Sequence, residues 1–107
     1  MSTPVMNDLA APMRALRLLA ADFPELPAVN VNVCTFAPDQ LELVSHDNLG
    51  AFEAWREAAG ILPESVTYKE QSEGRTRVLC ASTDYAGVHL RLVGFSDIPG
   101  HDGGEPL

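Results

Sequence analysis

Apolar side chains recur three and four residues apart in two stretches of the chain, a spacing typical of a helix with one buried face. The apolar positions of the first stretch are Met6, Leu9, Met13, Leu16, Ala20 and Phe23. Asn7 or Asp8 is suited to cap this helix, whereas Pro12 lacks the backbone N–H that a helical turn uses. Phe23 precedes Pro24, so the pattern predicts that the helix ends there.

The second helical stretch begins after Asp47 or Asn48, either of which can act as its N-cap. Its expected buried positions are Leu49, Phe52, Trp55, Ala59 and Leu62. Gly60 followed by the apolar Ile61 is the signature of a Schellman ending, in which a glycine adopts the left-handed backbone conformation. The pattern therefore predicts a helix of about three turns.

Five further stretches alternate apolar and polar residues, which is the period of a strand with one buried face. They cover residues 28–36, 40–45, 65–69, 75–83 and 87–95. A three-residue turn that contains Pro38 would pair Val33 with Leu43 and Val31 with Ser45. The opposite, more polar face of this pair would then hold Asn30, Asn32, Cys34, Glu42, Val44 and His46.

The turns between the last three strands define the expected register of the remaining pairs. A turn at residues 84–86 would place Cys80 opposite Leu90, and the loop at residues 71–74 would place Val66 opposite Val78. The residues left on the reverse side of the sheet would be Arg77, Leu79, Ala81, His89, Arg91, Val93 and Phe95.

The order α-ββ-α-βββ predicts an α+β fold, with a mainly antiparallel five-stranded sheet and two helices on one face. We expect a single domain over residues 1–95. Residues 96–107 are rich in Gly and Pro, so we expect a disordered tail there.

The reverse side of this sheet is less polar than fully solvated strands usually are. Leu79, Val93 and Phe95 would lie on it, and Leu18 would lie on a weakly apolar outer face of the first helix. A symmetry mate covering these residues would explain them, although single exposed apolar residues are common in any protein. We therefore predict a homodimer with these four residues at its interface.

The charge limits the classes of partner. Fifteen acidic and seven basic residues give a formal net charge of −8, which opposes approach to nucleic acid or to an anionic membrane. We therefore expect neither as a partner. The first stretch contains proline and charged residues where a signal peptide is apolar, so we expect a cytosolic protein with Cys34 and Cys80 as free structural thiols.

Polar residues on the reverse side form the candidate ligand site. Asn30, Asn32, His46, His89 and Arg91 would share one surface if the first and last strands were neighbours. Glu42 could orient His46 as an acid–base pair, and the free amides after Asp47 could bind an anion. We favour the simpler interpretation, which is an exposed polar face beside a helix cap. The chain has no nucleotide, metal or reactive-cysteine motif, so we expect no catalytic residue, cofactor or metal ion.

Two stretches carry a resemblance of style and spacing rather than a motif: LVSHDNLGAFEAWREAAG at residues 43–60 and TDYAGVHLRLVGF at residues 83–95. They are similar to uncharacterised small acidic proteins of high-GC actinobacteria and their phages or integrated elements. This resemblance implies an accessory or regulatory role and transfers no site residue. The absence of catalytic signatures and the surplus apolar residues on the reverse sheet face lead us to predict a small protein–protein interaction module. Two alternatives stay open: a small-molecule-binding or minor enzymatic domain that uses the polar sheet face, and an acidic inhibitor that mimics nucleic acid.

Overall fold

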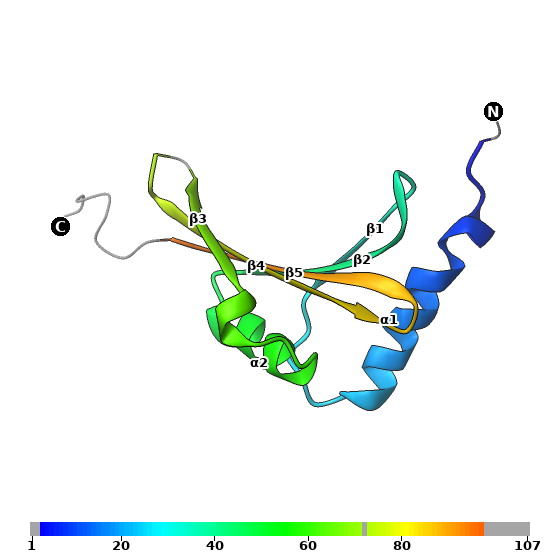
Figure 1. Cartoon of the computed structure of the whole chain (residues 1–107), viewed down its shortest axis with the longest axis horizontal. Coiled ribbons are helices and arrows are strands. Elements are labelled where there is room, and N and C mark those ends of the chain that lie inside the picture. Colours follow the sequence, from blue (N-terminus) through cyan, green and yellow to red (C-terminus); the bar gives the residue numbers. More distant parts are fainter. Residues whose placement is uncertain (1–2, 72, 98–107) are drawn as a thin grey trace.

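The computed structural model describes residues 3–71 and 73–97 and has the predicted α+β fold (Figure 1). Its helical segments are the 3₁₀ helix η1 (Met6–Leu9), α1 (Ala10–Asp22), α2 (Leu49–Ala58) and the 3₁₀ helix η2 (Pro63–Ser65). Its strands are β1 (Asn30–Cys34), β2 (Ala37–His46), β3 (Thr67–Gln71), β4 (Thr76–Tyr85) and β5 (Val88–Asp97). The predicted tail at residues 96–107 starts too early, because Ser96 and Asp97 still belong to β5; its remaining residues lie outside the described ranges.

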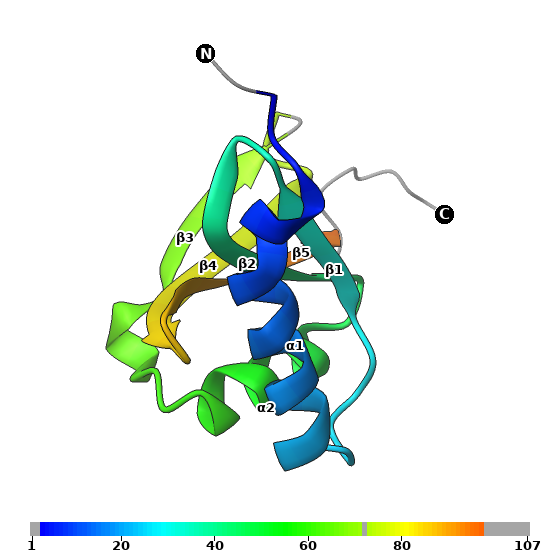
Figure 2. The same cartoon turned by 90° about the vertical axis from the view of Figure 1, so that its right-hand side faces the viewer.

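The five strands form one sheet in the order β1-β2-β5-β4-β3. Neighbouring strands are antiparallel except for β2 and β5, which run parallel with Leu41 beside Leu90 and Leu43 beside Leu92. A parallel pair needs a long crossover connection, and the chain from α2 through β4 provides it. As predicted, α1 and α2 lie on the same side of the sheet, and neither covers the opposite side (Figures 1 and 2).

The main core lies between the two helices and the sheet. Ala15 and Leu19 come from α1, and Phe52 and Trp55 come from α2. The buried residues that the sheet contributes are Leu41, Leu43, Ala81, Val88, Leu90 and Leu92. The alternating leucines of β2 and β5 therefore face the helices, as their strand periodicity predicts.

The buried face of the first helical stretch agrees only in part with the predicted one, since Leu9 is buried and Leu16 and Phe23 pack against the main core as expected. Pro12, Ala15 and Leu19 are buried, whereas Met6 and Met13 are exposed. Both sets of positions repeat at three and four residues, so the periodicity alone does not separate them. The observed face carries the small Ala15 at its centre, which lets the helix backbone approach the sheet closely, and it turns the flexible methionines outward.

Local signals at both ends of α2 are confirmed. Asn48 is the N-cap, because its Oδ1 accepts a hydrogen bond from the Ala51 amide at 3.0 Å. At the other end Gly60 has a φ of +77°. The amides of Gly60 and Ile61 donate to the carbonyls of Glu57 and Arg56, which are the two hydrogen bonds of the Schellman motif.

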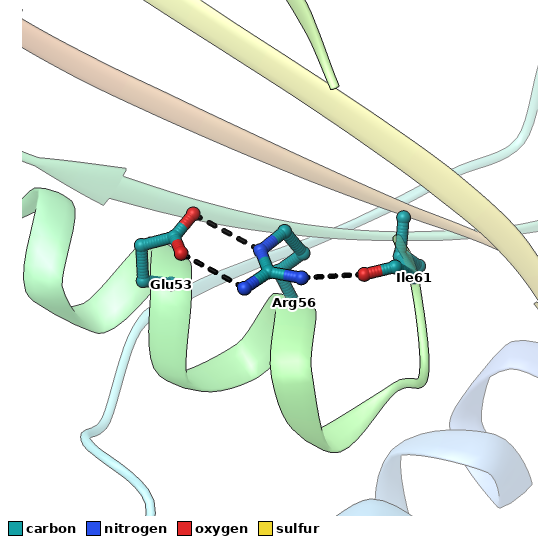
Figure 3. Close-up of polar contacts among 3 residues, drawn as sticks. All are labelled: Glu53, Arg56 and Ile61. Carbon is teal, nitrogen blue, oxygen red and sulfur yellow. Dashed lines mark hydrogen bonds and ion pairs between the residues drawn. The ribbon is translucent and has the colours of Figure 1, made fainter. Parts of the chain in front are cut away.

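Arg56 lies in the last turn of α2, and Figure 3 shows its polar contacts. Its side chain is buried, which the sequence pattern did not predict. Its Nε and Nη2 donate to the two carboxylate oxygens of Glu53 at 3.0 and 2.9 Å, and its Nη1 donates to the Ile61 carbonyl at 2.6 Å. The hydrogen bond to Glu53 raises the pKa of Arg56 above its usual value. Leu62, which was predicted to be buried, is exposed, and the residue that enters the main core after the Schellman turn is its neighbour Ile61.

The register of β4 differs from the predicted one by three residues. The turn between β4 and β5 has only Ala86 and Gly87 at its centre, with φ of +51° and +83°, and both residues therefore satisfy the type I′ requirement. Cys80 consequently lies opposite Val93 rather than Leu90. Since side chains alternate between faces, an odd shift moves every residue of β4 to the other face. The expected positions of Arg77, Leu79 and Ala81 on the reverse side are therefore wrong.

In the other two hairpins, β1–β2 and β3–β4, the observed register also differs from the predicted one. Between β1 and β2, Val31 lies opposite Leu43 rather than Ser45, a shift of two residues that leaves residues 30–32 on their predicted faces. The pairing is irregular between Asn32 and Cys34, where Cys34 lies opposite Ala37. Between β3 and β4, Tyr68 lies opposite Leu79 rather than Thr76. This shift of three agrees with the reassigned faces of β4.

Candidate functional site

The helix-free face of the sheet has a small apolar cluster of its own. Val44, Val78 and Val93, from β2, β4 and β5, are 7%, 2% and 5% exposed, and the partly buried Cys80 and Phe95 pack against them. Cys80 was expected in the main core, and the shifted register of β4 explains its position here. The ends of the β1–β2 and β3–β4 hairpins rise on this side of the sheet (Figure 1). The three valines are therefore already sheltered within the single chain.

A polar network crosses the same face above β1, β2 and β5. The carboxylate of Glu42 accepts one hydrogen bond from Asn32 Nδ2 and one from Arg91 Nε, both at 3.0 Å. Arg91 Nη2 also lies 3.8 Å from the Cys80 sulfur. Both oxygens of Glu42 are thus engaged, and within the described ranges no hydrogen bond joins it to His46. The arrangement does not supply the orienting carboxylate that the predicted acid–base pair would need.

His46 lies at the end of β2, where its ring stacks on Phe95 of β5 with centroids 5.2 Å apart. Together with Asn30, Ser45 and Asn48, it lines a polar hollow of about 220 Å³ near the start of α2. The Ser45 hydroxyl is buried and has no hydrogen-bond partner in the described part of the chain. This hollow is small and half polar, and Asn48 already satisfies the Ala51 amide of the helix.

The five residues of the predicted ligand site share one face but do not converge. The neighbours are β2 and β5 rather than β1 and β5, so Asn32 and Arg91 meet through Glu42, while Asn30 and His46 line the hollow near α2. His89 lies near the beginning of β5, with its Nδ1 3.8 Å from the Asp84 carboxylate. The structure therefore divides the predicted set into three separate places.

The predicted interface residues are similarly divided. Val93 and Phe95 lie on the helix-free face, as expected. Leu79 lies on the helix-covered face and packs against the main core, because the register of β4 is shifted. Leu18 is 42% exposed on α1, away from both positions. These residues therefore do not form one surface in a single chain.

The two edges of the sheet differ in charge. β1 forms one edge, and residues 30–36, which span it and the following turn, include no charged side chain. β3 forms the other edge and contains Lys69 and Glu70. An edge strand presents unpaired backbone N–H and C=O groups, and charged side chains are one way in which proteins discourage pairing there. The β1 edge has no such charge.

An apolar hollow of about 310 Å³ opens beside β1, between α1 and the segment that leads into the strand. Its lining includes Leu16, Leu19 and Ala20 of α1, Pro24, Ala28 and Val29 of the connecting segment, and Val31 of β1. Trp55 forms part of the wall, and its Nε1 donates to the Pro27 carbonyl at 2.8 Å. Phe23 meets the same indole edge-to-face, with centroids 6.4 Å apart. The wall is therefore held in place within the single chain.

Phe36 is the most exposed large apolar side chain that the structure describes. It lies in the two-residue turn between β1 and β2 and is 95% exposed, whereas Val31 on the same edge is 39% exposed. The alternating pattern placed Phe36 at the end of a predicted strand and indicated no role for it. An aromatic residue at a turn position, where Gly, Asn, Asp and Pro are usual, is the signal that could have identified it.

Cys34 and Cys80 are both free, and Cys34 is exposed near the end of β1. Within residues 3–71 and 73–97, no three His, Cys, Asp or Glu side chains are grouped so that they could hold a metal ion. In the same part of the chain, no helix is long and apolar enough to cross a membrane.

No protein-family model, curated protein or solved structure matches this chain. The similarity to small actinobacterial and phage proteins therefore stays a prediction.

Proposed function

We propose that this protein is a small cytosolic interaction module that works as a homodimer, in which the free edge of β1 pairs with β1 of a second copy. The observation that carries the proposal is the contrast between the sheet edges: β1 is uncharged, whereas β3 bears Lys69 and Glu70. Unpaired backbone groups on an uncharged edge favour the addition of another strand. Exposed Val31 adds apolar area at the same place.

The charge distribution supports this choice. A net charge of −8 repels a second copy, but the repulsion between exposed charges is largely screened beyond a Debye length of about 8–10 Å. Two uncharged edges can therefore meet while the carboxylates of both chains stay at a distance.

The helix-free face offers less to a second copy. Val93 was expected at an interface on this face, but only 5% of its surface is exposed in the single chain. Val44 and Val78 are buried beside it. Hydrophobic stabilisation is proportional to the apolar area that association removes from water. Since these valines have little area left to lose, Phe95 would have to supply most of the gain on that face.

Antiparallel pairing about a two-fold axis gives the β1 contact a defined register. The pairing that overlaps all five residues of the strand is centred on Asn32 and brings Asn30 beside Cys34 of the second copy, with the irregularity of β1 between Asn32 and Cys34 lying next to its centre. Opposed residues share a sheet face, so the helices of both copies stay on the same side. The result is one continuous ten-stranded sheet with all four α-helices on one face.

The proposal is tested by measuring the mass in solution over a dilution series, using sedimentation or light scattering. The wild type is expected to reach twice the chain mass of 11.5 kDa at high concentration. Asn30 and Cys34 are both exposed, so the double variant N30K/C34K should fold but place lysines opposite one another in the dimer. We expect it to be monomeric, and an equimolar mixture with N30E/C34E should recover dimers because each opposed pair then carries opposite charges.

The variant F95D separates this proposal from association through the helix-free face. A dimer that persists in F95D and is lost in N30K/C34K supports the β1 edge. A folded monomer in F95D, together with an intact dimer in N30K/C34K, would show that the second copy binds the helix-free face. A wild type that remains monomeric at all concentrations would contradict the homodimer itself.

A further inference from the structure

We infer that the apolar hollow beside β1 is a binding site for one small uncharged molecule of two fused aromatic rings. The hollow lies between α1 and the segment that leads into β1, and it is separate from the polar sheet face on which a ligand site was predicted. It is complete within one chain, so the inference does not depend on the proposed dimer.

The walls of the hollow are held in place without a ligand. Three of the lining side chains, Leu19, Leu43 and Trp55, are 1%, 3% and 9% exposed and belong to the main core. The Trp55 indole is fixed by two contacts, because its N–H donates to the Pro27 carbonyl at 2.8 Å and its ring packs edge-to-face against Phe23. A ligand would therefore lose little affinity to ordering the protein.

The lining determines the charge of the ligand. Every lining side chain is apolar apart from the indole N–H of Trp55, and that group is already hydrogen-bonded. A charged group buried against such a surface would lose its hydration without gaining a partner. The net charge of −8 further disfavours an anion. The hollow therefore selects an uncharged, largely hydrocarbon molecule.

The volume and the ring-rich walls determine the size and shape of the ligand. An apolar cavity of about 150 Å³ holds one benzene ring, so a hollow of about 310 Å³ has room for about two. Aromatic rings pack edge-to-face or offset against one another, and Phe23 and Trp55 both line the hollow. A rigid pair of fused rings also loses less conformational entropy on binding than a flexible chain of equal volume.

A titration with naphthalene, followed by the ¹H–¹⁵N resonance of the Trp55 indole N–H, tests the inference. This resonance is unique, since the chain has a single tryptophan. The ring current of naphthalene beside the indole should shift the resonance to saturation, with a Kd of roughly 10–100 µM for a ligand of about ten non-hydrogen atoms. The anion 2-naphthoate has the same rings plus a carboxylate, and it should bind at least about 10-fold more weakly.

Two neighbouring alanines of α1 provide matched variants. Both are exposed, but Ala20 lines the hollow and Ala21 does not. A20F should fill part of the hollow from its own chain and weaken naphthalene binding at least about 10-fold, whereas A21F should stay within about 2-fold of the wild type. A20K adds a cation at the exposed rim and should tighten 2-naphthoate binding by roughly 3- to 5-fold, a gain that misfolding would not produce.

Three results would overturn the inference. One is a Trp55 resonance that naphthalene leaves unshifted up to its solubility limit; if that resonance depends instead on protein concentration, a second copy fills the hollow. Another is wild-type binding of 2-naphthoate that is as tight as that of naphthalene, which would refute the uncharged class. A third is a set of affinities that neither A20F nor A20K changes relative to A21F, which would place the ligand elsewhere on the chain. None of these results bears on the β1 pairing, which the mass in solution tests separately.

Discussion

Gly94 occupies the middle of β5, directly beneath α2, and its replacement by alanine probes how closely the helix lies on the sheet. A Cβ atom added at this position would lie 3.1 Å from Phe52 Cδ1 and 3.3 Å from Leu49 Cδ2. Both distances are shorter than ordinary carbon–carbon contacts of about 3.5–4.0 Å. We therefore predict that G94A forces α2 outward or strains the Phe52 side chain.

The magnitude follows from two opposing contributions. Overpacking a core by a methyl group costs roughly 1–3 kcal/mol, whereas replacing a strand glycine lowers the entropy of the unfolded chain and offsets about 0.5–1 kcal/mol. The expected net loss is about 1–2 kcal/mol of unfolding free energy. For a domain of this size, that corresponds to a decrease in Tm of roughly 4–15 °C.

The assay is urea unfolding followed by Trp55 fluorescence, at one fixed protein concentration because the proposed dimerisation would add stability. The matched control is G50A in the first turn of α2, where the added Cβ lies 3.4 Å from Asn48 Oδ1 and meets no other atom. That variant should be stabilised by up to about 0.5–1 kcal/mol. Equal effects of the same substitution at both sites would refute the close packing of α2 on β5.

Two further predictions concern the α2 cap and a tyrosine. N48A should lose about 1 kcal/mol of unfolding free energy, since the Ala51 amide loses its side-chain acceptor, while N30A on the exposed β1 should stay within about 0.5 kcal/mol of the wild type. Burial, and then the nearby carboxylate of Asp22, raise the pKa of Tyr85 above its usual value of 10.0. The unfolded chain therefore loses this proton first, so stability should be intact below pH 10 and fall as the pH rises further. Y85F should show a shallower decline in unfolding free energy when wild type and variant are unfolded in parallel across this range, and an identical slope would count against the assignment.

The sequence by itself determined the local features of this protein. Asn48 and Gly60 mark the two ends of α2 because a cap and a left-handed glycine act through backbone groups only a few residues away. The alternation along β2 and β5 likewise identified the leucines of the main core, since strand periodicity depends on neighbouring residues alone. The fold class followed from the order of these elements.

The tertiary structure decided what depends on residues far apart in the chain. The face that α1 buries is selected by its fit to the sheet, and the type I′ turn at Ala86 and Gly87 sets the face of every residue in β4. The parallel pairing of β2 with β5 separates β1 from β5, and it thereby divides the predicted polar site. The hollow beside β1 exists only once α1, the segment before β1 and Trp55 are assembled around it. Its shape is a property of packing between distant segments, which periodicity along the sequence does not encode.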